Sequence, residues 1–210
     1  MSSALDLFNG FNLPAAIAYA FTLTATPGPN NVMVMSSGAN HRYRRTVPCL
    51  LGMSVGCTFI VALSAAGLGV VFNREPRLRT VLFFVGAAYL CWLAWQIGSS
   101  GAPAGVEANA RAPARKPLSF LQGAVFQFAN PKTWLMGINI VVLFSLPGAA
   151  FIPSMAAVCT IVLLVSFFSM SLWAGFGVAI HHRFRTERAW RIFNIVMALL
   201  LLACVPMLFW

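Results

Sequence analysis

The feature that most constrains this chain is its shortage of charge. Only 9% of its 210 residues are Asp, Glu, Lys or Arg, whereas 60% are hydrophobic. A soluble domain carries about 25% charged residues, and so few charges cannot cover a water-facing surface. The composition therefore argues against the soluble folds and predicts an all-α, polytopic membrane protein embedded in a lipid bilayer.

Charged or Pro- and Gly-rich clusters divide the chain into apolar stretches long enough to cross a membrane. About 20 apolar residues span a hydrocarbon core of roughly 30 Å. We predict one transmembrane domain, residues 1–210, with six transmembrane helices at residues 11–35, 47–72, 80–98, 120–145, 152–180 and 192–210. A basic linker, residues 99–117, separates a first half (1–98) from a second half (118–210), with three helices in each.

The basic residues lie mainly in alternate loops. Of the 14 Lys and Arg residues, ten lie in the first, third and fifth loops (42–45, 111–116 and 183–191) and three in the second. The positive-inside rule places the odd-numbered loops in the cytoplasm and both termini outside. The net charge of +10 therefore indicates topology rather than a nucleic-acid partner. Residues 1–10 contain no Lys or Arg, so we expect no cleaved signal peptide.

The chain offers little for catalysis or metal binding. Its five cysteines lie in apolar stretches without a CxxC or Cys/His cluster, which is typical of small buried side chains. The six apolar stretches contain no His, Asp or Glu. We therefore expect no catalytic residue, no metal and no cofactor, and predict that the protein is not an enzyme.

Two apolar stretches are interrupted by proline near their middles. The first contains Thr26, Pro27, Gly28, Pro29, Asn30 and Asn31, and the fourth contains Gln127, Asn130, Pro131 and Lys132. Proline breaks the helical hydrogen-bond ladder, which should free the carbonyls of Leu23, Ala25 and Gln127. A packed kink is the alternative explanation for each proline. A matched pair of breaks, one opening each half, is instead typical of a transporter binding site.

The chemistry of such breaks suits a zwitterion. The N-terminus of a half-helix attracts an anion, and freed carbonyls attract a cation. We therefore predict that the ten residues of the two interruptions bind the substrate, namely Thr26, Pro27, Gly28, Pro29, Asn30, Asn31, Gln127, Asn130, Pro131 and Lys132. Three helices in each half would also make the second half an inverted copy of the first, as in many secondary transporters.

Lys132 is the only basic residue inside a predicted helix. It lies twelve residues into the fourth stretch, about 18 Å along a helix. A lysine at mid-membrane costs about 2.5–3.5 kcal/mol, so it should face the protein interior. We predict that it meets a substrate carboxylate; snorkelling to an interface or neutralisation by burial is the alternative. No acidic residue lies in the six stretches, which disfavours a substrate with a cationic side chain.

Several motifs together resemble the LysE/RhtB family of bacterial amino-acid exporters. They are Thr26 to Asn30 (TPGPN), Ser37 to Ala39, Arg44 to Thr46, Gly86 to Leu90, Trp92 to Trp95, Phe120 to Gly123 and Phe126 to Lys132. The resemblance implies a secondary transporter in the bacterial inner membrane that exports amino acids or close derivatives, driven by the proton gradient. Some family members carry an acid in the second segment, where this chain has Ser54 and Thr58, so a neutral substrate is favoured over a basic one.

Other functions remain open from the sequence. A channel or a non-transporting scaffold would have a similar composition, and a membrane enzyme would need catalytic groups that the apolar stretches lack. No GxxxxGK[ST] motif for ATP is present. Gly52 and Gly56 form a GxxxG pair, which permits either close helix packing within the chain or a homodimer contact.

Overall fold

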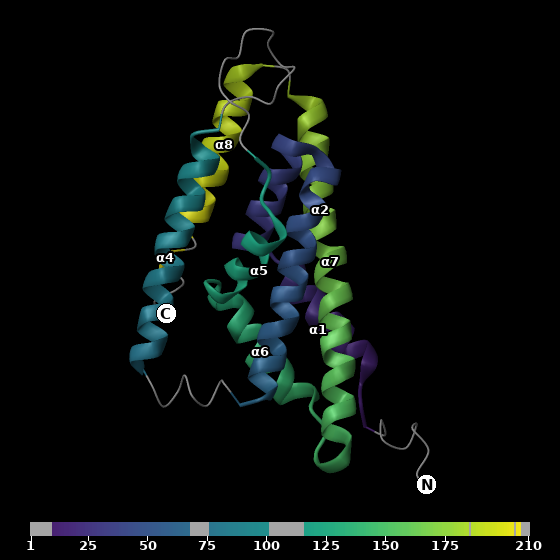
Figure 1. The fold of residues 1–210 in the computed structure, drawn as a ribbon. Coiled ribbons are helices and arrows are strands. Elements are labelled where there is room, and N and C mark those ends of the chain that lie inside the picture. The colour runs from purple at the N-terminus through teal and green to yellow at the C-terminus, as the bar shows by residue number, and fades with distance from the viewer. Residues whose placement is uncertain (1–9, 68–75, 101–115, 185, 204, 207–210) are drawn as a thin grey trace.

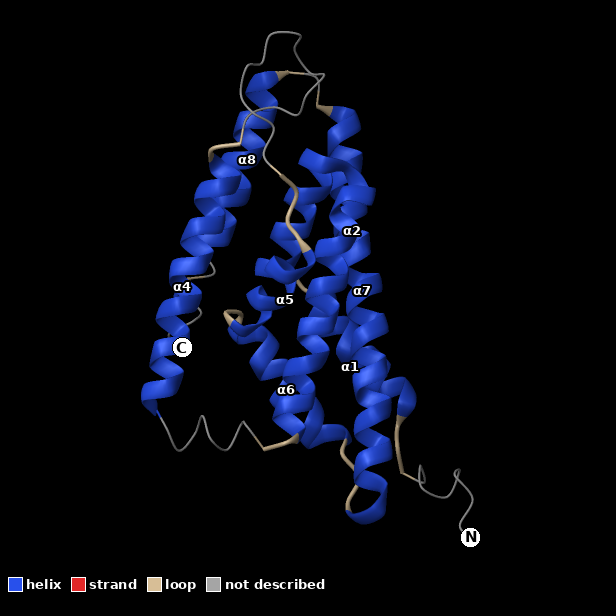
Figure 2. Cartoon of the chain, in the orientation of Figure 1, coloured by secondary structure: helices blue, strands red, loops and turns tan. Residues whose placement is uncertain are grey.

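The computed structural model describes residues 10–67, 76–100, 116–184, 186–203 and 205–206, and all regular structure in these ranges is helical (Figures 1 and 2). The helices are α1 (Leu13–Ala25), α2 (Pro29–Ala65), α4 (Pro76–Gly98), α5 (Phe120–Phe128), α6 (Pro131–Phe144), the short 3₁₀ helix η2 (Gly148–Ala150), α7 (Phe151–Arg183) and α8 (Glu187–Leu202). The predicted all-α class is confirmed. Most of the predicted linker, 101–115, and the acidic residues Asp6, Glu75 and Glu107 lie outside the described residues.

Two helical elements have the length of membrane helices, and the surface of the protein is apolar. In the part of the chain that the structure describes, α2 and the segment Gly148–Arg183 are long and apolar enough to cross a bilayer. Large apolar side chains face outward, with Val142, Ile152 and Trp95 all more than 70% exposed, whereas Gln127 and Asn194 are fully buried. This distribution reverses that of a soluble protein and fits a lipid-facing surface. The count of six spans and the inverted repeat stay predictions.

Helix α2 consists of two arms, residues 29–41 and 43–65, that meet at Arg42. We predicted a loop between the first two stretches, and the structure reduces it to this one non-helical residue, with φ 68° and ψ 165°. Residues other than glycine rarely adopt this backbone conformation, which costs roughly 1–3 kcal/mol. The surrounding contacts must therefore hold the bend in place.

Two close helix contacts hold the arms of α2. A Cβ on Gly177 of α7 would lie 2.0 Å from the Met35 carbonyl oxygen of the first arm. On the second arm, a Cβ on Gly52 would lie 1.9 Å from the Phe120 carbonyl oxygen of α5, and one on Gly56 would lie 2.7 Å from that of Ala124. The predicted GxxxG pair therefore serves close packing within the chain.

The ends of the last helix differ from the prediction. Helix α8 begins at Glu187 rather than at residue 192, and its helical span ends at Leu202. The Thr186 side chain accepts a hydrogen bond from the Ala189 backbone N–H at 3.3 Å and so caps the helix start. The arginines at this end are therefore part of the helix, although the sequence pattern placed the boundary after them.

Candidate functional site

Both predicted helix breaks are present. Helix α1 ends at Ala25 and α2 begins at Pro29, while α5 ends at Phe128 and α6 begins at Pro131. Proline suits the first position of a helix because its missing N–H would have no helical partner there. At the second break, Asn130 caps α6 by accepting a hydrogen bond from the Lys132 backbone N–H at 3.1 Å. The prolines therefore start new helices and do not merely kink old ones.

Protein donors occupy the carbonyls at the first break. The Asn31 amide nitrogen donates to the backbone oxygens of Thr24 and Thr26 at 3.1 and 2.7 Å, and the Trp173 indole of α7 donates to that of Ala25 at 3.1 Å. At the second break, the Trp134 indole donates to the Phe128 oxygen at 3.0 Å. Of the carbonyls that we expected to be free, that of Ala25 is thus hydrogen-bonded within the protein, and that of Gln127 accepts from the Asn130 backbone N–H at 3.2 Å.

An amide cluster joins the two breaks. Asn30 and Gln127 exchange a pair of hydrogen bonds of 3.0 and 3.2 Å, and Asn130 donates to the Asn30 side-chain oxygen at 3.0 Å. The oxygen of Gln127 also accepts from the Thr133 hydroxyl at 3.0 Å and the Cys57 thiol at 3.2 Å. Since Gln127 is fully buried and its polar atoms are engaged, it holds Asn30 in position.

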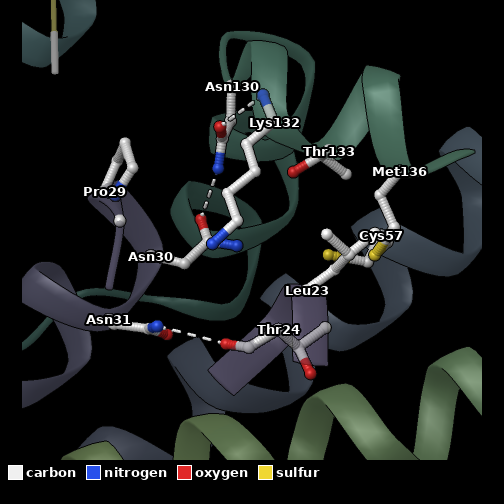
Figure 3. A pocket seen from close by; sticks show the side chains of 11 residues that line it. Leu23, Thr24, Pro29, Asn30, Asn31, Cys57, Asn130, Lys132, Thr133 and Met136 are labelled. Atoms are coloured by element: carbon white, nitrogen blue, oxygen red, sulfur yellow. Dashed lines mark hydrogen bonds between the residues drawn. The ribbon is translucent and has the colours of Figure 1, made fainter. Parts of the chain in front are cut away.

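Lys132 reaches across from α6 to the first break (Figure 3). Its ammonium donates to the Thr26 carbonyl oxygen at 2.7 Å. It also lies beside the start of α2, because a Cβ on Gly28 would be 3.4 Å from its Nζ atom. Helix α2 begins without a side-chain cap, and the first N–H groups of a helix carry a partial positive charge. The lysine and the helix start therefore produce a positive potential at one place.

A cavity of about 20 Å³ lies at this place. It is lined by six of the predicted residues: Gly28, Pro29, Asn30, Asn31, Asn130 and Lys132. Thr26 contributes through its bond to Lys132, whereas Pro27, Gln127 and Pro131 do not line the cavity. A space of this size holds about one water molecule, so it is too small for an amino acid in this conformation.

Five further residues line the cavity that sequence reasoning did not place there: Leu23, Thr24, Cys57, Thr133 and Met136. Thr133 and Met136 follow Lys132 within one helical turn, and Leu23 and Thr24 precede the first break by about one turn, so helical spacing could have found them. Cys57 comes from the second arm of α2, and its sequence context indicated only a buried apolar residue. None of the eleven lining residues is acidic.

One acceptor beside the cavity has no partner. The side-chain oxygen of Asn31 is buried without a hydrogen bond, and Asn31 is only 2% exposed. The amide orientation follows from the hydrogen-bond network, since the opposite orientation would set this oxygen against the Thr24 and Thr26 carbonyls. Buried polar atoms are nearly always paired, so this oxygen is a position for a donor supplied by a ligand or water.

Comparison with known proteins identifies the family of this chain. Residues 21–205 match the model of the LysE type translocator family. The chain belongs to this family. It is therefore a membrane transporter and not an enzyme.

Curated relatives cover nearly the whole chain. The cysteine/O-acetylserine efflux protein of Salmonella choleraesuis (strain SC-B67) is 34% identical over 201 residues, which is 94% of this chain and 97% of the relative. The protein of the same name from Escherichia coli (strain K12) is 33% identical over 202 residues, with the same coverage. No solved structure matches the chain significantly. The range that matches the family model spans both breaks.

Proposed function

We propose that this LysE-type translocator exports a small neutral amino acid or a close derivative across the bacterial inner membrane, driven by the proton gradient. The observation that carries this proposal is the Lys132 ammonium beside the uncapped start of α2, in a cavity without an acidic residue. Cysteine and O-acetylserine, which the relatives' names specify, are the first candidates because both are small, neutral zwitterions.

The two poles of an amino acid find matching groups in the cavity. Its carboxylate would replace the Thr26 carbonyl as the partner of Lys132 and accept from the first N–H groups of α2. Its ammonium would donate to the unpaired oxygen of Asn31. An acidic side chain, which a cationic substrate would require, is missing from the lining, so a basic amino acid would bury an unpaired charge at a high cost.

The substrate side chain would lie against neutral groups. Cys57 and Met136 line the cavity with sulfur-containing side chains, and Leu23 adds an aliphatic one. Methionine adapts its shape and is polarizable, which suits a short thiol or acetyl ester. The cavity must enlarge to admit such a molecule, and movement of one half against the other at the breaks would provide this.

Transport by membrane vesicles of inverted orientation tests the proposal. Vesicles with the protein should accumulate radiolabelled O-acetyl-L-serine saturably, and an uncoupler should abolish accumulation. Lys132→Gln removes the charge with similar length, so we expect at least a tenfold loss of Vmax/KM, an order of magnitude typical for a lost charged contact. Lys132→Arg, which keeps the charge, should lose less.

Three outcomes would contradict the proposal. They are the absence of protein-dependent uptake of any amino acid, unchanged uptake by Lys132→Gln, and a preference for lysine or arginine as substrate. Ionic conductance without saturable counterflow would identify a channel. Size-exclusion chromatography of each variant in detergent establishes that loss of uptake is not loss of fold.

A further inference from the structure

A second cavity lies farther along the first arm of α2. Its volume is about 40 Å³, and residues of α2, the end of α4 and the segment before α5 line it. Figure 1 shows that segment passing between α4 and α2 toward α5. The cavity is near the ends of the helices that the basic loops connect, which is the side that the charge distribution predicts to be cytoplasmic.

Seven of the eleven residues that line this second cavity have polar or basic side chains. Ser36, Ser37, Asn40, His41, Gln96, Ser100 and Lys116 contribute to it, and Ser36 and Ser37 are at most 5% exposed. A packing void between membrane helices would be apolar and dry. Ser36 accepts from the Asn40 amide nitrogen at 3.4 Å and Ser37 pairs with the Thr46 hydroxyl at 2.9 Å. Because a hydroxyl oxygen has two lone pairs, each serine still has a lone pair for an incoming donor.

Asn40 is held in a fixed orientation beside this space. Its amide nitrogen donates to the Ser36 carbonyl at 2.9 Å and to the Asn194 side-chain oxygen at 3.1 Å. The Asn194 nitrogen in turn donates to the Ser100 carbonyl at 2.9 Å. These bonds leave the Asn40 side-chain oxygen as an acceptor for an incoming donor, while the Lys116 ammonium contributes a positive charge that attracts an anion.

One face of α2 contributes residues to both cavities. Asn30 lines the central cavity, and Met33 and Ser37 line the second. These positions are three and four residues apart, so they follow one another on the same helix face. Met33 is fully buried between them, and its unbranched side chain can change rotamer to open a passage.

We propose that the second cavity is a waiting site that binds the exported zwitterion before it reaches the central cavity. Lys116 attracts the substrate carboxylate, the Asn40 oxygen and the serine hydroxyls accept from its ammonium, and Met33 separates the two positions. This inference rests on the proposed function, since it takes its ligand from there. It adds a second binding position and a direction of approach.

Equilibrium binding to purified protein tests this inference. With radiolabelled O-acetyl-L-serine, the wild type should bind two equivalents and Lys132→Gln should keep the one at the waiting site. Ser36→Val adds apolar volume to the second cavity, so the single variant Ser36→Val should bind one equivalent, at the central cavity. The double variant Ser36→Val/Lys132→Gln should bind none. If Lys132→Gln abolishes all binding, the waiting site is refuted and the central site stands. If the wild type binds nothing, the proposed function itself fails.

Kinetics provide a second test that does not depend on a core substitution. Lys116 is exposed, so Lys116→Gln should fold normally and raise KM for uptake into inverted vesicles by roughly two- to fivefold, with Vmax unchanged, as expected for one exposed charge. Arg183 is an exposed residue at the same end of the protein, in α7, and does not line the cavity, so Arg183→Gln is the control for loss of a charge. An equal rise of KM in both variants, or none in Lys116→Gln, would refute the waiting site.

Discussion

Neighbouring residues of the second break perform different tasks. Lys132 lines the central cavity and bonds to the backbone of the other half, whereas Gln127 is fully buried and bonds to Asn30, Cys57, Thr133 and the Gly123 backbone. The sequence placed both residues in the substrate site. We therefore expect substitution of Gln127 to reduce stability, and substitution of Lys132 to reduce transport while leaving stability near that of the wild type.

Replacing Gln127 should reduce stability. Gln127→Leu keeps the volume but leaves Thr133, Cys57 and Asn30 without their shared acceptor, and each buried unpaired group costs about 1–3 kcal/mol. We expect a clearly lower midpoint of thermal unfolding in detergent. Lys132→Gln is the matched control and should unfold near the wild-type midpoint. An unchanged midpoint for Gln127→Leu would refute its positioning role.

The sequence predicts part of this site and misses the rest for a physical reason. Proline chemistry locates both breaks, and the cost of a membrane lysine identifies Lys132. Cys57 reaches Gln127 of the second break because α2 bends, and Trp173 reaches Ala25 of the first break because α7 crosses α2. Such long-range contacts leave no local sequence pattern. The hydrogen bonds that engage the polar atoms of the Gln127 side chain leave no such pattern either.

At the scale of the element, α2 is defined by its bend. The cluster of arginines predicted a loop, but the structure makes the turn with Arg42 alone, at φ 68°. Glycine adopts this region without strain, while in an ordinary helical position it costs about 1 kcal/mol relative to Ala. A pair of glycine substitutions can therefore distinguish a strained backbone position from an ordinary helical one.

Arg42→Gly and Arg44→Gly remove the same charge from the same exposed region. Arg42→Gly should leave the unfolding midpoint unchanged or raise it, because relief of strain offsets the entropy of glycine. Arg44 is helical, so Arg44→Gly should lose about 1 kcal/mol of stability. Equal losses in chemical unfolding would show that Arg42 is not strained.

The crossing of α2 and α7 depends on one of two neighbouring glycines. Gly177→Ala would place Cβ 2.0 Å from the Met35 carbonyl oxygen, whereas a Cβ on Gly175 would meet nothing within 4 Å. We expect Gly177→Ala to lose about 1–3 kcal/mol through overpacking and to impair transport. Gly175→Ala should be neutral or gain up to about 1 kcal/mol. Thermal unfolding of both variants checks this, and equal midpoints would contradict the close crossing.

At the scale of the whole molecule, the two predicted halves meet at more than the central site. The amide cluster and the Lys132 bond join them at the breaks. Helices α4 and α8 lie side by side at one edge of the molecule (Figure 1). If transport proceeds by movement of one half against the other, the α4–α8 contact must also change during each cycle, as must the contacts of α2 with α5 and α7.

A disulfide across the α4–α8 contact tests that motion. A Cβ on Gly98 would lie 3.1 Å from the Ala198 Cβ, and disulfides need about 3.5–4.5 Å, so a shift of a few tenths of an ångström permits the bond. With the native cysteines replaced by Ser, Gly98→Cys/Ala198→Cys should lose most of its transport on oxidation and recover it on reduction. Each single variant should transport equally before and after oxidation. Full transport by the cross-linked protein would mean that α4 and α8 move as one body, and the boundary between the moving parts would then lie elsewhere than at residues 99–117.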